Sequence, residues 1–146
     1  MSDVNNDTVY LLQECNAGVK MGVDAIDEVL GDVQNPTLRQ LLQIGKEAHQ
    51  RIGSDAHRML NDYDAPGKEP NAMARGMSWL KTNWKMTMDD SDATVADLIT
   101  DGCNMGVKSL NRYINQYPAA NEQARQLTDE LVQVEQQMAV SLSRYL

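Results

Sequence analysis

The stretch of sequence that decides the fold is the last one, residues 119–146, AANEQARQLTDELVQVEQQMAVSLSRYL. Its apolar residues recur at alternating steps of four and three, which places them on one face of an α-helix. We therefore predict an amphipathic helix from about Ala119 to the C-terminus. The residues of this stripe are Ala120, Ala124, Leu127, Leu131, Val134, Met138, Leu142 and Tyr145.

Three earlier segments carry the same spacing, and we predict helices over residues 7–31, 35–63 and 93–116. The second opens at Asn35-Pro36, where Asn is a favoured N-cap and Pro suits the first helical position. The stripes are Leu12, Cys15, Val19, Gly22, Ile26, Leu30 and Val33 in the first segment, Leu38, Leu41, Leu42, Gly45, His49, Ile52, Ala56, Leu60 and Tyr63 in the second, and Val95, Leu98, Gly102, Met105, Gly106, Leu110 and Tyr113 in the third.

Residues 64–92 are too long for a tight connection between two antiparallel helices. Apolar residues between Met73 and Met88 follow helical spacing, so we predict a short extra helix over about 71–85. No stretch alternates with the two-residue period of a strand. The chain is therefore predicted to be all-α, a single domain over residues 1–146, with two helical hairpins joined by one long crossover. One crossover between the second and third long helices is the ferritin-like arrangement of a four-helix bundle.

The composition limits the classes of partner. The chain has 146 residues, 42% of them hydrophobic, and its formal net charge is −8. Nucleic-acid-binding proteins present a basic patch, whereas these basic residues are scattered among more numerous acidic ones. No apolar run approaches the length that spans a bilayer, and the first seven residues are polar. We therefore expect no nucleic-acid partner, no membrane partner, and a bacterial-type cytoplasmic protein with reduced thiols.

An internal repeat links the two predicted hairpins. Residues 15–20, CNAGVK, and residues 103–108, CNMGVK, are identical at five of six positions. Each copy falls in the middle of a long predicted helix, which indicates duplication of a hairpin. Glycine weakens a helix interior, and we expect close approach of two helix backbones to offset that cost. The two cysteines are either small buried residues or a thiol or cofactor site at the pseudo-symmetric centre.

These features together resemble the ferritin-like superfamily, and in particular its small bacterial families of unknown function. The resemblance is carried by the long Met-rich helices, the crossover and the duplicated hairpin. The run NPTLRQLL at residues 35–42 also resembles the opening of the second helix in spore-coat-F-like proteins. The resemblance implies a four-helix bundle whose centre, in the metal-binding members, holds a pair of iron or manganese ions.

The ligand set of that metal pair is incomplete in this sequence. The family pattern has one Glu on each of two helices and Glu-x-x-His on each of the other two. Glu14 could serve on the first helix, but its repeat counterpart is Gly102. Glu47 and Glu135 are equivalent under the repeat, but neither is followed by a histidine three residues later. His49 is only two residues from Glu47, so the two point about 160° apart around the helix.

The weak metal candidates are therefore Glu14, Glu47, Glu135 and His49, and no catalytic or cofactor-binding residue is assigned. We expect Glu47 and Glu135 to be solvated or at the edge of a stripe, and His49 to be a satisfied core or interface histidine. The apolar stripes are then predicted to close without a matched set of carboxylate and imidazole groups at the centre.

The function expected from the sequence is a non-catalytic interaction or structural module that forms a homodimer and carries no cofactor. There is no Gly-rich phosphate loop and no Cys-x-x-Cys pair, and the two histidines leave few carriers for acid–base catalysis. One alternative is a metal-binding or redox protein with a degenerate di-iron-type site that holds iron or manganese. The other is a spore-coat-associated or stress-associated protein. The sequence names neither the partner nor the ligand.

Overall fold

A computed structural model describes residues 2–66 and 89–146 of the chain. Within those residues the regular structure is four long α-helices and a short 3-10 helix. The long helices are α1 (Ser2–Leu30), α2 (Pro36–Asn61), α4 (Asp92–Gln116) and α5 (Glu122–Leu142). The 3-10 helix, η1 (Ser143–Tyr145), follows α5 directly. The described part of the chain has no strand, and the prediction of an all-α fold is confirmed.

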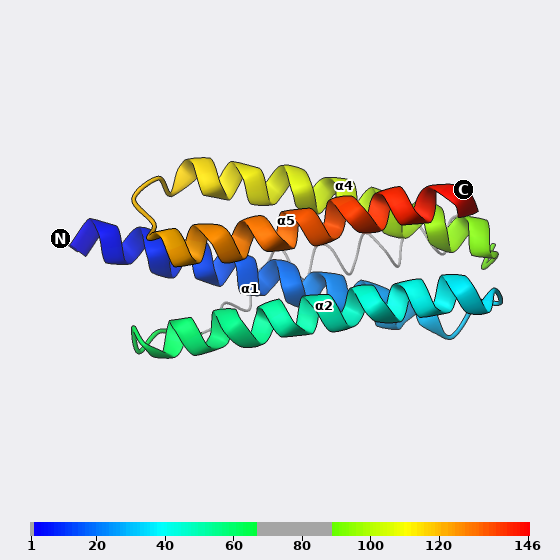
Figure 1. The fold of residues 1–146 in the computed structure, drawn as a ribbon, viewed down its shortest axis with the longest axis horizontal. Coiled ribbons are helices and arrows are strands. Elements are labelled where there is room, and N and C mark those ends of the chain that lie inside the picture. The colour runs from blue at the N-terminus through cyan, green and yellow to red at the C-terminus, as the bar shows by residue number, and fades with distance from the viewer. Residues whose placement is uncertain (1, 67–88) are drawn as a thin grey trace.

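The four helices form two antiparallel hairpins that pack against each other along their length (Figure 1). α1 pairs with α2, and α4 pairs with α5. α2 ends at the end of the bundle where α1 begins, whereas α4 begins at the opposite end, near the C-terminus (Figure 1). The connection from α2 to α4 therefore joins opposite ends of the bundle, as predicted. The predicted short helix over 71–85 lies outside the described residues.

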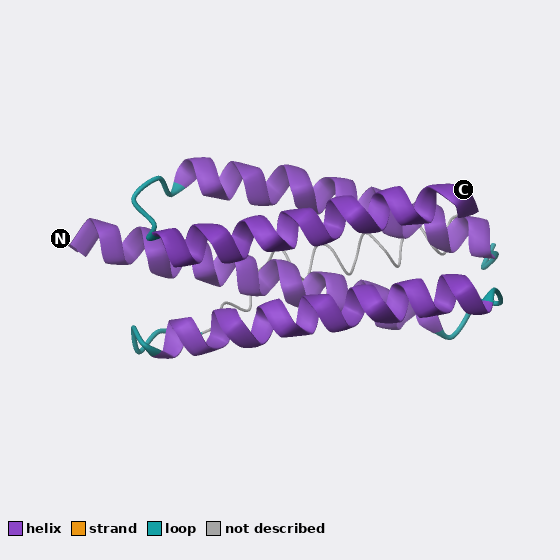
Figure 2. Cartoon of the chain, viewed as in Figure 1, coloured by secondary structure: helices purple, strands orange, loops and turns teal. Residues whose placement is uncertain are grey.

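Side chains cap the N-termini of α2, α4 and α5, which begin after short loops (Figure 2). Asn35 caps α2 as predicted, because its Oδ1 atom accepts hydrogen bonds from the backbone N–H groups of Thr37 and Leu38 at 2.8 and 3.2 Å. Asn121 caps α5 in the same way, so α5 begins at Glu122 and the predicted start at Ala119 was three residues early. α1 begins at Ser2, ahead of the predicted start at Asp7.

The core consists of two clusters of buried apolar residues, one in each half of the bundle. The first cluster is Leu11, Leu12, Cys15, Val19, Ile52, Ala56, Leu60, Leu110, Ala120, Ala124, Leu127, Leu131 and Val132. The second cluster is Ile26, Val29, Val33, Leu38, Leu42, Val95, Ala96, Ile99, Cys103, Met138 and Leu142. Along every helix the residues between these two sets lie near the middle of the bundle.

Two stripes differ from their predicted register. On α5, Val134 is half-buried and Glu135 is buried, so the predicted stripe was one residue off at the middle of this helix. On α4, Met105 is 50% exposed, while Ile99 and Cys103 are buried. The buried face of each helix is wider than a single line of residues, because each helix packs against more than one neighbour.

Several glycines in the helices make room for a side chain of a neighbouring helix. A Cβ atom at Gly22 would lie 2.6 Å from Nε2 of His49, and one at Gly45 would lie 2.6 Å from Sδ of Met138. A Cβ atom at Gly106 would overlap the carboxyl group of Glu135. The prediction of close contact between helix backbones concerned the repeat glycines, Gly18 and Gly106. It was wrong, because the nearest neighbours of a Cβ atom at both positions are side-chain atoms, those of Leu131 and Leu110 at Gly18 and those of Glu135 at Gly106.

Candidate functional site

A polar layer separates the two apolar clusters at the centre of the bundle. It consists of one residue from each long helix, Gly22 on α1, His49 on α2, Gly106 on α4 and Glu135 on α5, and we call it the central layer. In each hairpin the first helix contributes the glycine and the second contributes the polar side chain that occupies the space beside it. The central layer therefore repeats the same arrangement in both hairpins, with an imidazole in one and a carboxyl group in the other.

His49 is buried, with 1% of its surface exposed. Its Nδ1 atom lies 2.7 Å from the backbone carbonyl oxygen of Gly45, one turn earlier on α2. A carbonyl oxygen only accepts, so Nδ1 carries the proton and Nε2 presents a lone pair. Nε2 is buried and has no hydrogen-bond partner among the described residues. Burial lowers the pKa of His49, and the hydrogen bond to Gly45 opposes this only in part.

Glu135 is also buried, with 6% of its surface exposed. Burial raises its pKa from 4.5 to about 8, because the charged form loses its hydration. The carboxyl group is therefore mostly protonated at neutral pH. The thiols of Cys15 and Cys103 lie within electrostatic reach of Glu135, and burial raises the pKa of each to about 12. Both thiols are neutral at that pH, so no thiolate accompanies the carboxyl group.

His49 and Glu135 line the same small cavity, to which all four long helices contribute. Its volume is about 70 Å³, which exceeds what one water molecule needs. The wall is mostly apolar, and several of its side chains carry sulfur. The lining residues are Met21, Gly22, Ala25, Ile26, His49, Leu98, Ile99, Gly102, Cys103, Met105, Glu135 and Met138.

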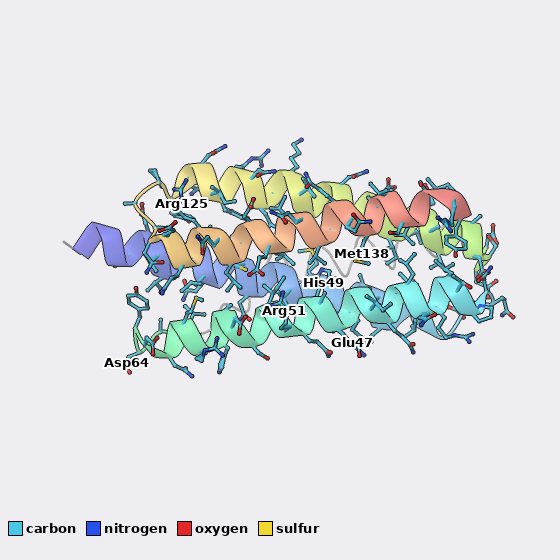
Figure 3. All side chains as sticks on the ribbon, viewed as in Figure 1. Glu47, His49, Arg51, Asp64, Arg125 and Met138 are labelled. Atoms are coloured by element: carbon cyan, nitrogen blue, oxygen red, sulfur yellow. The ribbon has the colours of Figure 1, made fainter. Side chains whose placement is uncertain are left out.

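The four metal candidates from the sequence do not all meet at this cavity. His49 and Glu135 line it, and Glu14 is buried on α1 but does not line it. Glu47 is exposed, and it lies along the edge of α2 away from α5, whereas His49 and Met138 lie between those helices (Figure 3). Glu47 and Glu135 thus occupy different environments, although the repeat makes them equivalent in sequence.

The central layer holds one carboxyl group and one imidazole, whereas the sequence predicted that the stripes close without a matched set of such groups. Glu135 is not a solvated or stripe-edge carboxylate, and His49 is not fully satisfied. Sequence reasoning named Glu135 as a metal candidate but missed its burial, because the stripe on α5 was drawn through Val134. In residues 2–66 and 89–146, no three His, Cys, Asp or Glu side chains gather as a group that could hold a metal ion. The repeat cysteines remain free thiols, and Cys15 and Cys103 belong to different clusters.

A second feature lies on the outside of the bundle, in a groove between α2 and α5. This α2–α5 groove encloses about 660 Å³. Ile44 projects from α2 into it with 59% of its surface exposed, and Leu41, Ala48 and Val134 add apolar side chains that are partly buried. The remaining lining residues are Thr37, Gln40, Gly45, Arg51, Glu130, Gln133, Gln137, Met138 and Ser141.

Charge is almost absent from the α2–α5 groove. The charged side chains that line it are Arg51 and Glu130, which pair across the two helices at 3.4 Å. The groove therefore has no net charge, although the chain as a whole carries −8. Protein interfaces are depleted in charged residues at their cores, so the groove has the composition of a buried contact surface.

Comparisons with known proteins bear on the fold. No known family profile matches the sequence, and no curated protein matches it. The structure is similar to the crystal structure of Dps92 from Deinococcus radiodurans, with a TM-score of 0.76 and 12% sequence identity, and the alignment covers 100% of this chain and 88% of that one. The chain therefore has the ferritin-like fold, as the sequence predicted. The resemblance of residues 35–42 to spore-coat-F-like proteins stays a prediction.

A helix that spans a membrane must be both long and apolar. In the part of the chain that the structure describes, no helix combines the length and the apolar character needed to cross a bilayer.

Proposed function

We propose that this chain, a bundle with the ferritin-like fold, is a non-catalytic interaction module that self-associates through the α2–α5 groove. The observation that carries the proposal is the exposure of Ile44 in a groove that has no net charge and is lined in part by apolar side chains. Apolar surface that is rimmed by polar residues is one of the features that mark protein–protein contacts. The proposal includes a cytoplasmic location, in keeping with two cysteines that remain thiols.

The net charge limits which face of the bundle a second copy of the chain could contact. Two molecules that each carry −8 repel each other at most relative orientations. The α2–α5 groove carries no net charge, so contact through it does not appose like charges. A two-fold dimer is built from one patch that meets its own copy, so Ile44 of each chain would lie against the α2–α5 groove of its partner.

The contribution of Ile44 follows from its exposure. Full burial of an isoleucine side chain contributes about 1.5–3 kcal/mol. The 59% that is exposed in the single chain therefore adds about 1–2 kcal/mol per copy, or about 2–4 kcal/mol per dimer. Introducing a carboxylate at this position removes that term and buries like charges on the two-fold axis, so the Ile44→Glu dimer should dissociate at least tens of times more readily.

The test compares Ile44→Glu with Val140→Glu by size-exclusion chromatography coupled to light scattering, at chain concentrations from about 10 to 200 µM. Val140 is a matched control, because it is a β-branched residue with 67% exposure that does not line the α2–α5 groove. Both changes remove a similar apolar group and add the same charge. We expect the wild type and Val140→Glu to be dimers and Ile44→Glu to be a monomer.

Two outcomes would contradict the proposal. One is a wild type that has the mass of a single chain, 16.3 kDa, throughout the concentration series. The other is equal loss of the dimer in both variants, which would mean that added charge, and not the α2–α5 groove, controls association. Circular dichroism of each variant confirms that the helices are retained before the masses are compared.

A further inference from the structure

The internal cavity beside the central layer combines features that point to a ligand, independently of the proposed self-association. His49 is held in one tautomer by the hydrogen bond from Nδ1 to the carbonyl oxygen of Gly45. Metal-binding histidines commonly donate their second ring N–H to a backbone carbonyl in this way, which fixes the ring and directs the other nitrogen at the ion. Nε2 of His49 is buried without a partner among the described residues, and it belongs to the cavity wall.

The other donors in the wall are mainly sulfur atoms. Cys103 and the three methionines Met21, Met105 and Met138 line the same cavity as His49. Thioether sulfur and cysteine thiolate select soft cations such as Cu(I), whereas Mg²⁺, Ca²⁺ and Mn²⁺ require several oxygen ligands. Cys103 is a neutral thiol in the free protein, so its binding of a cation releases the thiol proton to solvent. Glu135 supplies the single carboxyl group of the wall, which is too few oxygen ligands for a hard cation.

Size and access fit a single dehydrated ion. The cavity holds about 70 Å³, enough for one ion without its hydration shell. Met105 is half exposed at the wall, and a Cβ atom at Gly102 would meet nothing within 4 Å. The cavity wall therefore reaches the surface of the bundle at Met105 on α4.

We propose that the central cavity binds one soft monovalent cation of the Cu(I) class, with Nε2 of His49 as one ligand and sulfur atoms of the cavity wall as the others. This assignment differs from an oxygen-rich iron or manganese pair, for which the described residues lack the gathered carboxylates and histidines. It also explains the unpartnered Nε2 atom, since leaving a buried acceptor unsatisfied is costly.

The experiment is an anaerobic competition for Cu(I) between the full chain and the chromophoric chelator bathocuproine disulfonate. Two matched pairs of variants accompany the wild type. His49→Gln is compared with His57→Gln, because His57 is exposed on the same helix and outside the cavity. Cys103→Ala is compared with Cys15→Ala, because Cys15 is a buried free thiol that does not line the cavity.

The wild type is expected to withdraw about one equivalent of Cu(I) per chain. His49→Gln and Cys103→Ala should bind at least about 10-fold more weakly, whereas His57→Gln and Cys15→Ala should stay within about 3-fold of the wild type. Absence of transfer to the wild type would overturn the proposal. Equal weakening within either pair would do the same, because it would assign binding to surface groups or to thiols in general.

A second measurement avoids the core substitutions, which could unfold the bundle. Ag(I) nitrate is titrated into the wild type labelled with ¹⁵N at histidine, and the ring nitrogens of the two histidines are followed by NMR. The Nε2 resonance of His49 should move in a stoichiometric titration while that of His57 stays in place. An unchanged His49 resonance, or equal movement of both, would refute the assignment.

Discussion

The burial of Glu135 makes a quantitative prediction for the variant Glu135→Gln. The pKa of the Glu135 carboxyl group rises from 4.5 in the unfolded chain to about 8 in the bundle. The folded state therefore retains a proton that the unfolded state releases above pH 4.5. Stability linked to this group is fully present below pH 4.5 and is lost as the pH rises towards 8. Glutamine keeps the shape of the protonated acid but does not titrate.

The size of the effect follows from the shift. Each unit of pKa corresponds to about 1.4 kcal/mol, so Glu135 lowers the free energy of unfolding by about 3 kcal/mol between pH 5 and pH 8. Glu135→Gln does not lose this stability as the pH rises, because glutamine does not titrate. Its advantage over the wild type should therefore grow by about 3 kcal/mol across that interval. The titration of His49 is common to both proteins and cancels, and both cysteines stay neutral because their pKa values are about 12.

The assay is urea unfolding followed by circular dichroism at pH 5, 6, 7 and 8, for the wild type, Glu135→Gln and the control Glu47→Gln. Glu47 is exposed, so its replacement should leave the dependence on pH within about 0.5 kcal/mol of the wild type. If Glu135→Gln loses stability with rising pH as steeply as the wild type does, the carboxyl group is solvated and the description of the central layer is wrong.

Two further predictions concern packing and capping. Gly22→Ala should destabilise the bundle by about 1–3 kcal/mol, because its Cβ atom would meet the rigid ring of His49. Gly102→Ala should stabilise the bundle by about 0.5–1 kcal/mol through helix propensity, because its Cβ atom would meet no neighbouring atom. Equal effects of the two variants on thermal denaturation would contradict the assigned contacts. Asn35→Ala should cost about 1 kcal/mol because α2 loses two capping hydrogen bonds, and an unchanged melting temperature would show that the cap does not stabilise the helix.

The fold could be predicted from the sequence because the apolar residues keep helical spacing over long segments and because local residues mark where helices begin. Each stripe extends over many turns, and Asn35-Pro36 marks a helix start by short-range chemistry that the structure repeats. The exact ends of the helices were harder to predict from the sequence. Asn121 caps α5 with its own side chain, and nothing in the apolar pattern distinguishes that position from Ala119 two residues earlier.

The central layer could be predicted only in part. Gly22, His49 and Gly106 fall on the predicted stripes. These three members of the central layer can therefore be recognised in the sequence as small or polar residues within an apolar pattern. Glu135 does not fall on a predicted stripe, because a carboxylate is expected at the surface and the neighbouring Val134 is a plausible core residue. Its burial depends on the space beside Gly106, which is a relation between two helices and leaves no local signal in either.

The central functional claim is that the α2–α5 groove is where two chains meet, and the isoleucines report on it directly. The chain has five, Ile26, Ile44, Ile52, Ile99 and Ile114, and of these Ile44 is the one exposed in the groove. NMR spectra of the protein labelled at the isoleucine methyl groups, recorded over a dilution series, should show the Ile44 resonance moving with concentration while the other four stay fixed. An Ile44 resonance that does not move as the protein is diluted, or equal movement of all five, would contradict the account.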